Sequence, residues 1–240
     1  MNPALRKEYL QALGITPWVS RTAEVGASAA PPAPLRTPPG APSRAPHNPL
    51  REENLDWDQL RSRVAACTRC ALSQTRTQTV FGVGDPNADW LVVGEAPGAE
   101  EDRRGEPFVG RAGQLLDSML RAIGLARGQV YIANVLKCRP PGNRDPAPAE
   151  STECLPYLER QIALLKPKIM LAVGRIAAQN LLKTDLPLSK LRQQEHRFGP
   201  ARVPLVITYH PAYLLRTPTD KRKAWEDLKF AREVCGRVER

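Results

Sequence analysis

The chain has 240 residues, of which 42% are hydrophobic, enough for one ordinary folded domain and a tail. A net charge of +10 and a pI near 9.7 favour a polyanionic partner, although many basic proteins have none. The sequence contains no run of about 18 apolar residues, so it predicts no membrane span, and the N-terminus lacks the apolar core of a signal peptide. We therefore expect a cytoplasmic protein, in which disulfides rarely persist and the five cysteines need another explanation.

The first part of the chain differs in composition from the rest. Residues 1–20 hold a short amphipathic segment, and residues 21–50 read as a linker. Pro31 to Pro49 contains eight prolines in nineteen residues, which predicts an extended stretch with too little apolar surface to fold. We place the folded domain at residues 51–240. The segment from Leu5 to Trp18 could dock a protein partner as a short helix.

From Leu55 onward the apolar pattern alternates between strands and helices. The predicted strands are short apolar runs at Trp90–Val93, Val130–Val135, Ile169–Val173 and Val203–Thr208. The predicted helices lie between and after them, at Gly113–Ile123, Ser151–Leu165, Arg175–Leu182 and Lys221–Val238. This alternation predicts a three-layer α/β/α sandwich on a four-stranded parallel sheet.

Polar residues follow three of the predicted strands. The first strand runs into residues 94–98, the second ends at Asn134, and the fourth leads to residues 209–211. In open α/β sheets, ligands bind beyond the carboxyl ends of the strands. We therefore expect these polar groups to converge on one rim of the sheet.

Four of the five cysteines form a pattern that suits a metal site. They comprise one CxxC pair and two later residues: Cys67, Cys70, Cys138 and Cys154. A CxxC brings two thiolates to one metal within a single turn. Four cysteines suit either a structural zinc or a [4Fe–4S] cluster, and the spacing does not choose between them; buried, unliganded thiols are the remaining alternative. Cys235 has no place in the pattern and is expected to be a packed residue.

Three further features are candidates for chemistry, each with a plainer alternative. The acidic residues after the first strand, Glu100 to Asp102, either cap a solvated turn or position a water or a developing cation. Phe108 lies in a glycine-containing loop, where an aromatic ring can stack on a base or simply fill the core. His210 ends an apolar strand before Pro211, and could donate a hydrogen bond to a leaving group or to a nearby carbonyl.

Several separated strings, together with the cysteine pattern, resemble the family 4 iron–sulfur uracil-DNA glycosylases. The strings are GEAPG from Gly94, EPFVGRAG from Glu106, NVLKCRPPGNRDP from Asn134 and YHPAYLLR from Tyr209. Because they occur in order, they are far more specific together than any one alone. The resemblance covers residues 55–235 and leaves out the N-terminal part. It implies an enzyme that flips uracil out of DNA and hydrolyses its N-glycosidic bond, leaving an abasic site.

The resemblance assigns the cofactor and one wall of the base pocket. The four patterned cysteines would hold a [4Fe–4S] cluster with a structural rather than a redox role. Gly94, Glu95 and Ala96 would line the uracil pocket. The best-studied uracil glycosylases carry an aspartate where Ala96 stands, so the group that positions water is open. Glu95 and Glu101 are the candidates, with the backbone and the histidine as the alternative.

The resemblance also assigns the groups that would touch the base. Phe108 would stack on the flipped uracil, and Asn134 would pair with its Watson–Crick edge. An amide that donates to O4 and accepts from N3–H matches uracil, whereas cytosine reverses this pattern. His210 would stabilise negative charge on the uracil carbonyl as the bond breaks. Leu214 would be the wedge that enters the base stack.

Basic residues around these motifs are expected to contact phosphates, about half of them remaining plain surface charges: Arg103, Arg104, Lys137, Arg139, Arg144 and Arg216. We expect a monomer that acts on single- or double-stranded uracil-containing DNA of the nucleoid. Two alternatives remain. One is a zinc- or cluster-stapled DNA-binding module without catalysis. The other is a related branch that becomes trapped on abasic DNA, disfavoured because Lys137 to Asp145 lacks that branch's histidine.

Overall fold

The computed structural model describes residue 52 and residues 54–238. The predicted amphipathic segment and proline-rich linker at residues 1–50 lie outside the described residues. Among the described helices, none combines the length and apolar character needed to cross a lipid bilayer.

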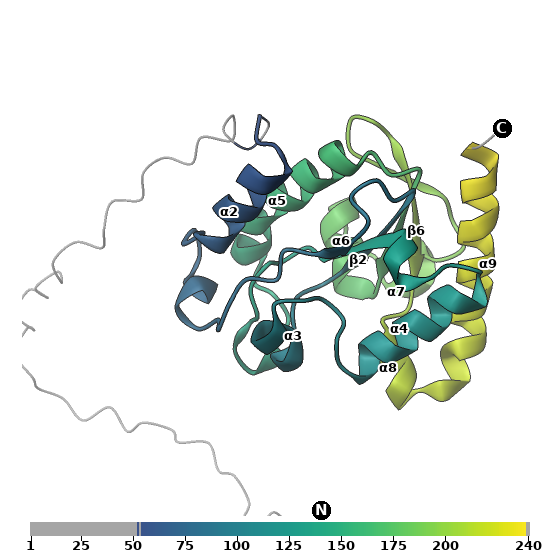
Figure 1. Ribbon diagram of the computed structural model, residues 1–240. Helices are drawn as coiled ribbons and strands as arrows, with labels where there is room; N and C mark the ends of the chain where they lie inside the picture. The colour runs from purple at the N-terminus through teal and green to yellow at the C-terminus, as the bar shows by residue number, and fades with distance from the viewer. Residues whose placement is uncertain (1–51, 53, 239–240) are drawn as a thin grey trace, which may run out of the picture. The chain divides into compact units, whose positions relative to one another are not determined.

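A sheet of six strands forms the centre of the described region (Figure 1). Its strands are β1 (Val83–Gly84), β2 (Trp90–Gly94), β3 (Val130–Asn134), β4 (Ile169–Val173), β5 (His196–Phe198) and β6 (Val203–Thr208), in the spatial order β1-β3-β2-β4-β6-β5. The four central strands are parallel, as predicted, whereas β1 and β5 add antiparallel edges. The predicted number of four strands was wrong because these edge strands are too short to show a hydrophobic period.

Helices connect the strands along the chain and cover the two faces of the sheet. They are α2 (Trp57–Ala65), α3 (Ala99–Arg104), α4 (Arg111–Ala122), α5 (Pro148–Leu165), α6 (Arg175–Leu182), α7 (Leu188–Leu191), α8 (Pro211–Arg216) and α9 (Lys221–Val238). Short 3-10 helices occur at η2 (Ala71–Gln74), η3 (Arg127–Gln129), η4 (Pro141–Asn143) and η5 (Pro218–Asp220). All four predicted helices are present, with ends within three residues of the predicted ones.

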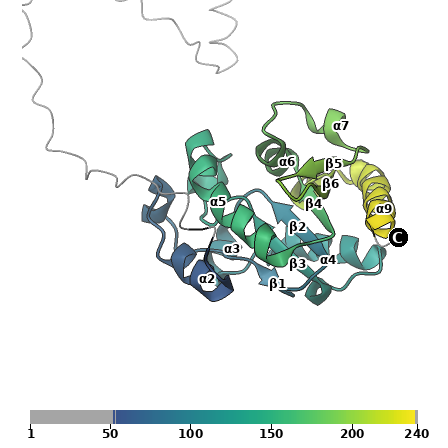
Figure 2. The same cartoon turned by 90° about the horizontal axis from the view of Figure 1, so that it is seen from above.

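The core lies in two layers, one on each face of the sheet. Alternate residues of β2 point to opposite faces: Leu91 and Val93 join one hydrophobic cluster, and Trp90 and Val92 join the other. Helices α2, α5, α6 and α7 complete the first cluster, and α4, α8 and α9 complete the second. Figure 2 shows α5 and α9 separated by the strands. The predicted three-layer α/β/α sandwich is therefore confirmed, and Cys235 packs into the second cluster as expected.

The carboxyl end of β6 is fixed by a buried ion pair. Asp227 of α9 is fully buried and accepts a hydrogen bond from the Thr208 hydroxyl at 2.9 Å. The Arg192 guanidinium donates to both carboxylate oxygens of Asp227 at 2.7 Å. Because the pair is fully hydrogen-bonded, its burial is tolerated and it holds the strand end against α9. The segment beyond Thr208, which carries His210, starts from a rigid point.

Candidate active site

One pocket at the carboxyl ends of the strands gathers most of the predicted site residues. Those that line it are Glu95, Ala96, Glu101, Phe108, Asn134 and His210, from four separate segments of the chain. The pocket has a volume of about 400 Å³. The expected convergence of polar groups on one rim of the sheet is confirmed.

Gly94 brings the pocket's aromatic ring and its amide close to the backbone. Gly94 of β2 lies opposite Asn134 of β3 in the parallel register. A Cβ atom at Gly94 would lie 2.3 Å from Asn134 Oδ1 and 2.7 Å from the Phe108 ring, so no larger residue fits. Asn134 is 2% exposed, and its Oδ1 accepts no hydrogen bond from any described residue. A buried acceptor without a donor costs about 1–3 kcal/mol, so the site is suited to a ligand that supplies an N–H group.

The Phe108 loop is held in an unusual backbone conformation. Phe108 has a φ of +53°, which costs a non-glycine residue free energy. The Glu101 carboxylate offsets that cost by accepting from the main-chain N–H groups of Val109 at 3.0 Å and Gly110 at 3.3 Å. Gly113 is required as well, because a Cβ there would lie 1.8 Å from the Phe108 carbonyl oxygen. Glu101 therefore fixes the aromatic ring at the pocket.

His210 is a neutral hydrogen-bond donor in this setting. Burial, reinforced by the nearby Arg216 cation, lowers the pKa of His210 to about 4, so the ring is neutral at pH 7. Its Nδ1 accepts from the Ala212 main-chain N–H at 3.1 Å, which leaves the proton on Nε2. The ring lies 5.6 Å from the Phe108 ring, centroid to centroid. A Cβ at Gly174, after β4, would lie 2.9 Å from His210 Cβ, so this glycine makes room for the histidine.

Glu95 is the pocket carboxylate with the most perturbed acidity. Burial, with a smaller contribution from the Asp145 carboxylate, raises the pKa of Glu95 to about 7, against the attraction of Arg175. Arg175 is paired with Asp145 at 3.0 Å. A carboxyl group that titrates near pH 7 can exchange a proton with a bound water at physiological pH.

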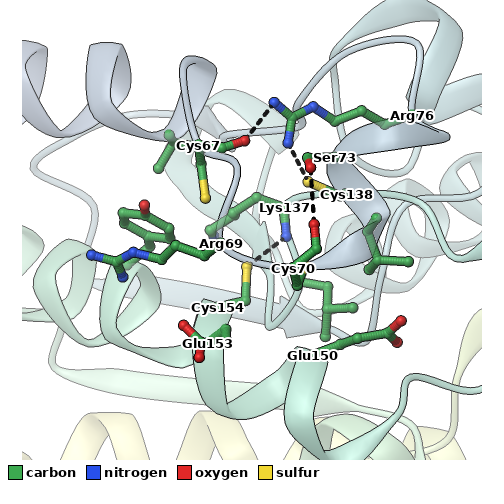
Figure 3. A pocket seen from close by; sticks show the side chains of 14 residues that line it. Cys67, Arg69, Cys70, Ser73, Arg76, Lys137, Cys138, Glu150, Glu153 and Cys154 are labelled. Carbon is green, nitrogen blue, oxygen red and sulfur yellow. Dashed lines mark hydrogen bonds between the residues drawn. The ribbon is translucent and has the colours of Figure 1, made fainter. Parts of the chain in front are cut away.

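The four patterned cysteines line a second, smaller cavity (Figure 3). Cys67 and Cys70 flank the turn after α2, Cys138 follows β3, and Cys154 lies in α5. Among the described residues, no group of three or more His, Cys, Asp or Glu side chains has the spacing expected around a single metal ion. The cavity brings all four thiol side chains to one place from three separate parts of the chain.

Hydrogen-bond donors and cations surround these sulfur atoms. Arg76 donates to Cys138 Sγ at 3.1 Å, and the Lys137 main-chain N–H donates to Cys154 Sγ at 3.1 Å. Burial raises the pKa of the Cys154 thiol to about 12, so its thiolate form requires a bound cation. Two buried and two partly buried cysteines, with N–H donors to two of the sulfur atoms and positive charge nearby, fit an anionic metal–thiolate group.

Two of the sequence-based assignments are wrong. Leu214, expected as the wedge that enters the base stack, is 1% exposed and packs in the second core cluster, because the inner face of α8 is covered by α4. The exposed apolar side chain of α8 is its neighbour Leu215, at 36%. Lys137, expected to contact phosphate, is 1% exposed, and burial lowers its pKa to about 8.

The remaining expected phosphate contacts stay at the surface. Arg144 and Arg216 line the pocket rim. Arg103 pairs with Glu100, and Arg139 donates to Asn143 Oδ1 at 2.7 Å. Arg104 is exposed.

Sequence reasoning overlooked several residues that shape the pocket. Asn143, at the end of η4, and Asp145, just beyond it, line the pocket on either side of Arg144, which was expected only as a phosphate contact. Gly174 was not noticed because a single glycine after a strand is a weak signal. The loop-clamping role of Glu101 could not be found either, since it depends on where the loop at Val109 returns.

The comparisons with known proteins agree with this geometry. Residues 81–229 match the profile of the Uracil DNA glycosylase superfamily. A type-4 uracil-DNA glycosylase of Archaeoglobus fulgidus is 42% identical over 187 residues, covering 75% of this chain and 94% of that protein. One from Thermotoga maritima is 41% identical over 186 residues, covering 76% of this chain and 95% of that protein. A type-5 enzyme of Thermus thermophilus is 36% identical over 118 residues, covering 43% of this chain and 53% of that protein.

The matches to type-4 enzymes extend over almost the whole length of those relatives, and the superfamily profile includes every pocket residue considered above. The chain belongs to the uracil-DNA glycosylase superfamily, and within it to the type-4 uracil-DNA glycosylases.

Proposed function

We propose that this protein flips uracil out of DNA into the pocket at the strand ends and hydrolyses its N-glycosidic bond, leaving an abasic site for repair. The observation that carries the proposal is the buried, unsatisfied Oδ1 of Asn134, which faces a pocket lined by an aromatic ring and a neutral histidine. A base inside a duplex cannot reach such a pocket, so it must be extruded.

Asn134 reads the edge of the base. Its Oδ1 accepts from uracil N3–H, and its Nδ2 donates to O4. Cytosine presents an acceptor at N3 and a donor at its exocyclic amine, so its binding would leave buried groups unpaired. Sites built on such hydrogen bonds reject the wrong substrate far more strongly than apolar pockets do. Phe108 supplies the stacking surface for the extruded ring.

His210 acts on the leaving group. Cleavage of the glycosidic bond leaves negative charge on the departing uracil, chiefly on its carbonyl oxygens. The neutral ring donates from Nε2 to that charge without having to lose or gain a proton. A donor that meets charge present only in the transition state raises the rate without tightening substrate binding.

Glu95 is the better of the two candidates for positioning the attacking water. The Glu101 carboxylate already accepts two main-chain hydrogen bonds that hold the Phe108 loop. Glu95 lines the pocket with a pKa near 7, and so can accept a proton from water as the sugar becomes cationic. Ala96, at the position of the missing aspartate, has no side-chain group for this task.

The cysteine cavity would hold a [4Fe–4S] cluster. Cys67, Cys70, Cys138 and Cys154 would ligate the iron atoms, and a single zinc ion is the alternative to the cluster. Bound there, the cluster would tie together three separate parts of the chain. We also expect a cytoplasmic monomer acting on nucleoid DNA; elution at twice the 26.5 kDa chain mass in gel filtration would contradict the monomer.

The first prediction concerns the metal. Protein purified without added metal should be yellow-brown, absorb broadly at about 400 nm and contain close to four irons per chain, as expected of cysteine-ligated clusters. Absorption spectra and elemental analysis check it. Colourless protein with one zinc per chain would establish the alternative.

The second prediction concerns His210. His210→Ala should slow single-turnover uracil excision by about 100- to 1,000-fold, the usual cost of one transition-state donor. The dissociation constant for uracil-containing DNA should change little. His196→Ala is the matched control, because this histidine lies outside the pocket, and it should excise at the wild-type rate.

The pH dependence separates the histidine from the carboxylate. With its pKa lowered to about 4, His210 stays neutral above pH 5 and contributes no inflection near 6.5. With its pKa raised to about 7, Glu95 is the base form only above that pH, so the rate should rise between pH 6 and 8. Glu95→Gln should excise uracil slowly, at a rate that does not change between pH 6 and 8. A wild-type profile without the rise would remove Glu95 as the water-positioning group.

The fourth prediction concerns the wedge. We assign it to Leu215, the exposed apolar side chain of α8. Leu215→Ala should reduce excision from duplex DNA more than from single strands, because only the duplex requires unstacking. Leu214→Ala is the paired variant and should instead lower stability by about 2–5 kcal/mol, the usual cost of a buried Leu truncation. Equal losses on both DNA forms in Leu215→Ala would contradict the assignment.

A further inference from the structure

Lys137 turns its charged end into the protein. At 1% exposure its ammonium needs compensating hydrogen bonds, because burying an unpaired charge is very costly. Its Nζ donates to the Asn134 main-chain oxygen at 2.9 Å and to Gln161 Oε1 at 2.6 Å. The side chain thus folds back onto the end of β3, three residues upstream of its own position.

The main chain of the same residue contacts the cysteine cavity. The Lys137 N–H donates to Cys154 Sγ at 3.1 Å, and Cys138 is the next residue (Figure 3). The Lys137 carbonyl accepts from the Val80 N–H at 2.8 Å. One residue therefore touches the cavity through its backbone and the Asn134 peptide through its side chain.

Gln161 fixes the direction of the ammonium. This side chain of α5 is 0% exposed, and its Nε2 donates to the Phe81 main-chain oxygen at 2.9 Å. That bond orients Oε1 toward Lys137, so the amide cannot turn over without losing both interactions. Helix α5 also carries Cys154, so Lys137 is gripped by the same helix at its backbone and at its tip.

We propose that Lys137 is a positioning residue for base recognition. Its ammonium holds the Asn134 peptide in place, and its own position is fixed by the hydrogen bonds to Cys154 and Gln161. The inference rests on the proposed role of Asn134 in reading uracil. Lys137 Nζ binds the main-chain oxygen of Asn134, and the side chain of the same residue is the pocket amide. A small shift of that peptide moves the carboxamide within a pocket where Gly94 leaves no spare room.

The direct test is Lys137→Met, which keeps the length of the side chain and the main-chain N–H but removes the ammonium. Lys190→Met is the matched control, because Lys190 is exposed on α7. Iron per chain and single-turnover uracil excision are measured for both, and the rate is expressed per iron-loaded molecule. We expect Lys137→Met to excise about 10- to 100-fold more slowly, as for other residues that orient a functional group, with Lys190→Met unchanged.

The double variant with Asn134→Ala tells positioning from general stabilisation. If Lys137 acts through Asn134, the double variant should be about as slow as Asn134→Ala alone. The inference would be overturned if the rate losses of the two single variants multiplied in the double variant. It would also be overturned if Lys137→Met lost activity only in proportion to its lost iron, so that its rate per iron-loaded molecule equalled that of the wild type. Asn134→Ala at the wild-type rate would instead refute the proposed reading role, so the two failures are distinguishable.

A second pair keeps the inference testable if Lys137→Met does not fold. Gln161→Leu removes both the acceptor for the ammonium and the donor to the Phe81 oxygen, whereas Gln161→Glu keeps the acceptor and loses only the donor. We expect Gln161→Leu to be slow, without a further loss in the Asn134→Ala background, and Gln161→Glu to excise faster than Gln161→Leu. Wild-type excision by Gln161→Leu would overturn the inference.

Discussion

The pocket and the cysteine cavity depend on one short stretch of backbone, residues 134–138. It starts at Asn134, in register with Gly94, and ends at Cys138. The Val135 and Leu136 N–H groups donate to the carbonyls of Gly94 and Glu95 at 2.9 and 3.0 Å. The stretch is therefore bonded along its length to the strand end that forms the pocket wall. Three residues separate the amide proposed to read the base from a cysteine of the cavity, so the positions of the two are linked.

The other side of the pocket is held by different means. His210 follows β6, whose end is tied to α9 through Thr208 and the Asp227–Arg192 ion pair. Phe108 is held in a left-handed conformation by the Glu101 carboxylate. Each group with a proposed role in binding or catalysis thus lies at a strand end or in a loop held by hydrogen bonds. Such preorganisation matters because donors fixed before the reaction need no reorganisation as charge develops.

Much of this arrangement could be predicted from the sequence, because its signals are local. Strands buried on both faces read as continuous apolar runs, so the four central strands were found almost to the residue. The rule that ligands bind at the carboxyl ends of parallel strands then placed Asn134 and His210 at one pocket. Separated motifs in a fixed order supplied the family.

The features that could not be predicted from the sequence depend on tertiary packing. In the short helix α8, Leu214 and Leu215 are chemically identical neighbours, and only the position of α4 decides which of them is buried. Lys137 reads as a surface cation because lysines rarely lie inside; its burial is allowed by Gln161, twenty-four residues away. The edge strands β1 and β5 depend on partners rather than on their own two or three residues.

The measurement that tests the account most directly is the base preference of Asn134→Asp. A carboxylate accepts hydrogen bonds but cannot donate to uracil O4, while it can accept from the exocyclic amine of cytosine. Single-turnover excision from matched uracil- and cytosine-containing oligonucleotides, in protein of equal iron content, should show slower uracil release and a narrowed ratio of uracil to cytosine excision. An unchanged ratio would mean that Asn134 does not read the base edge.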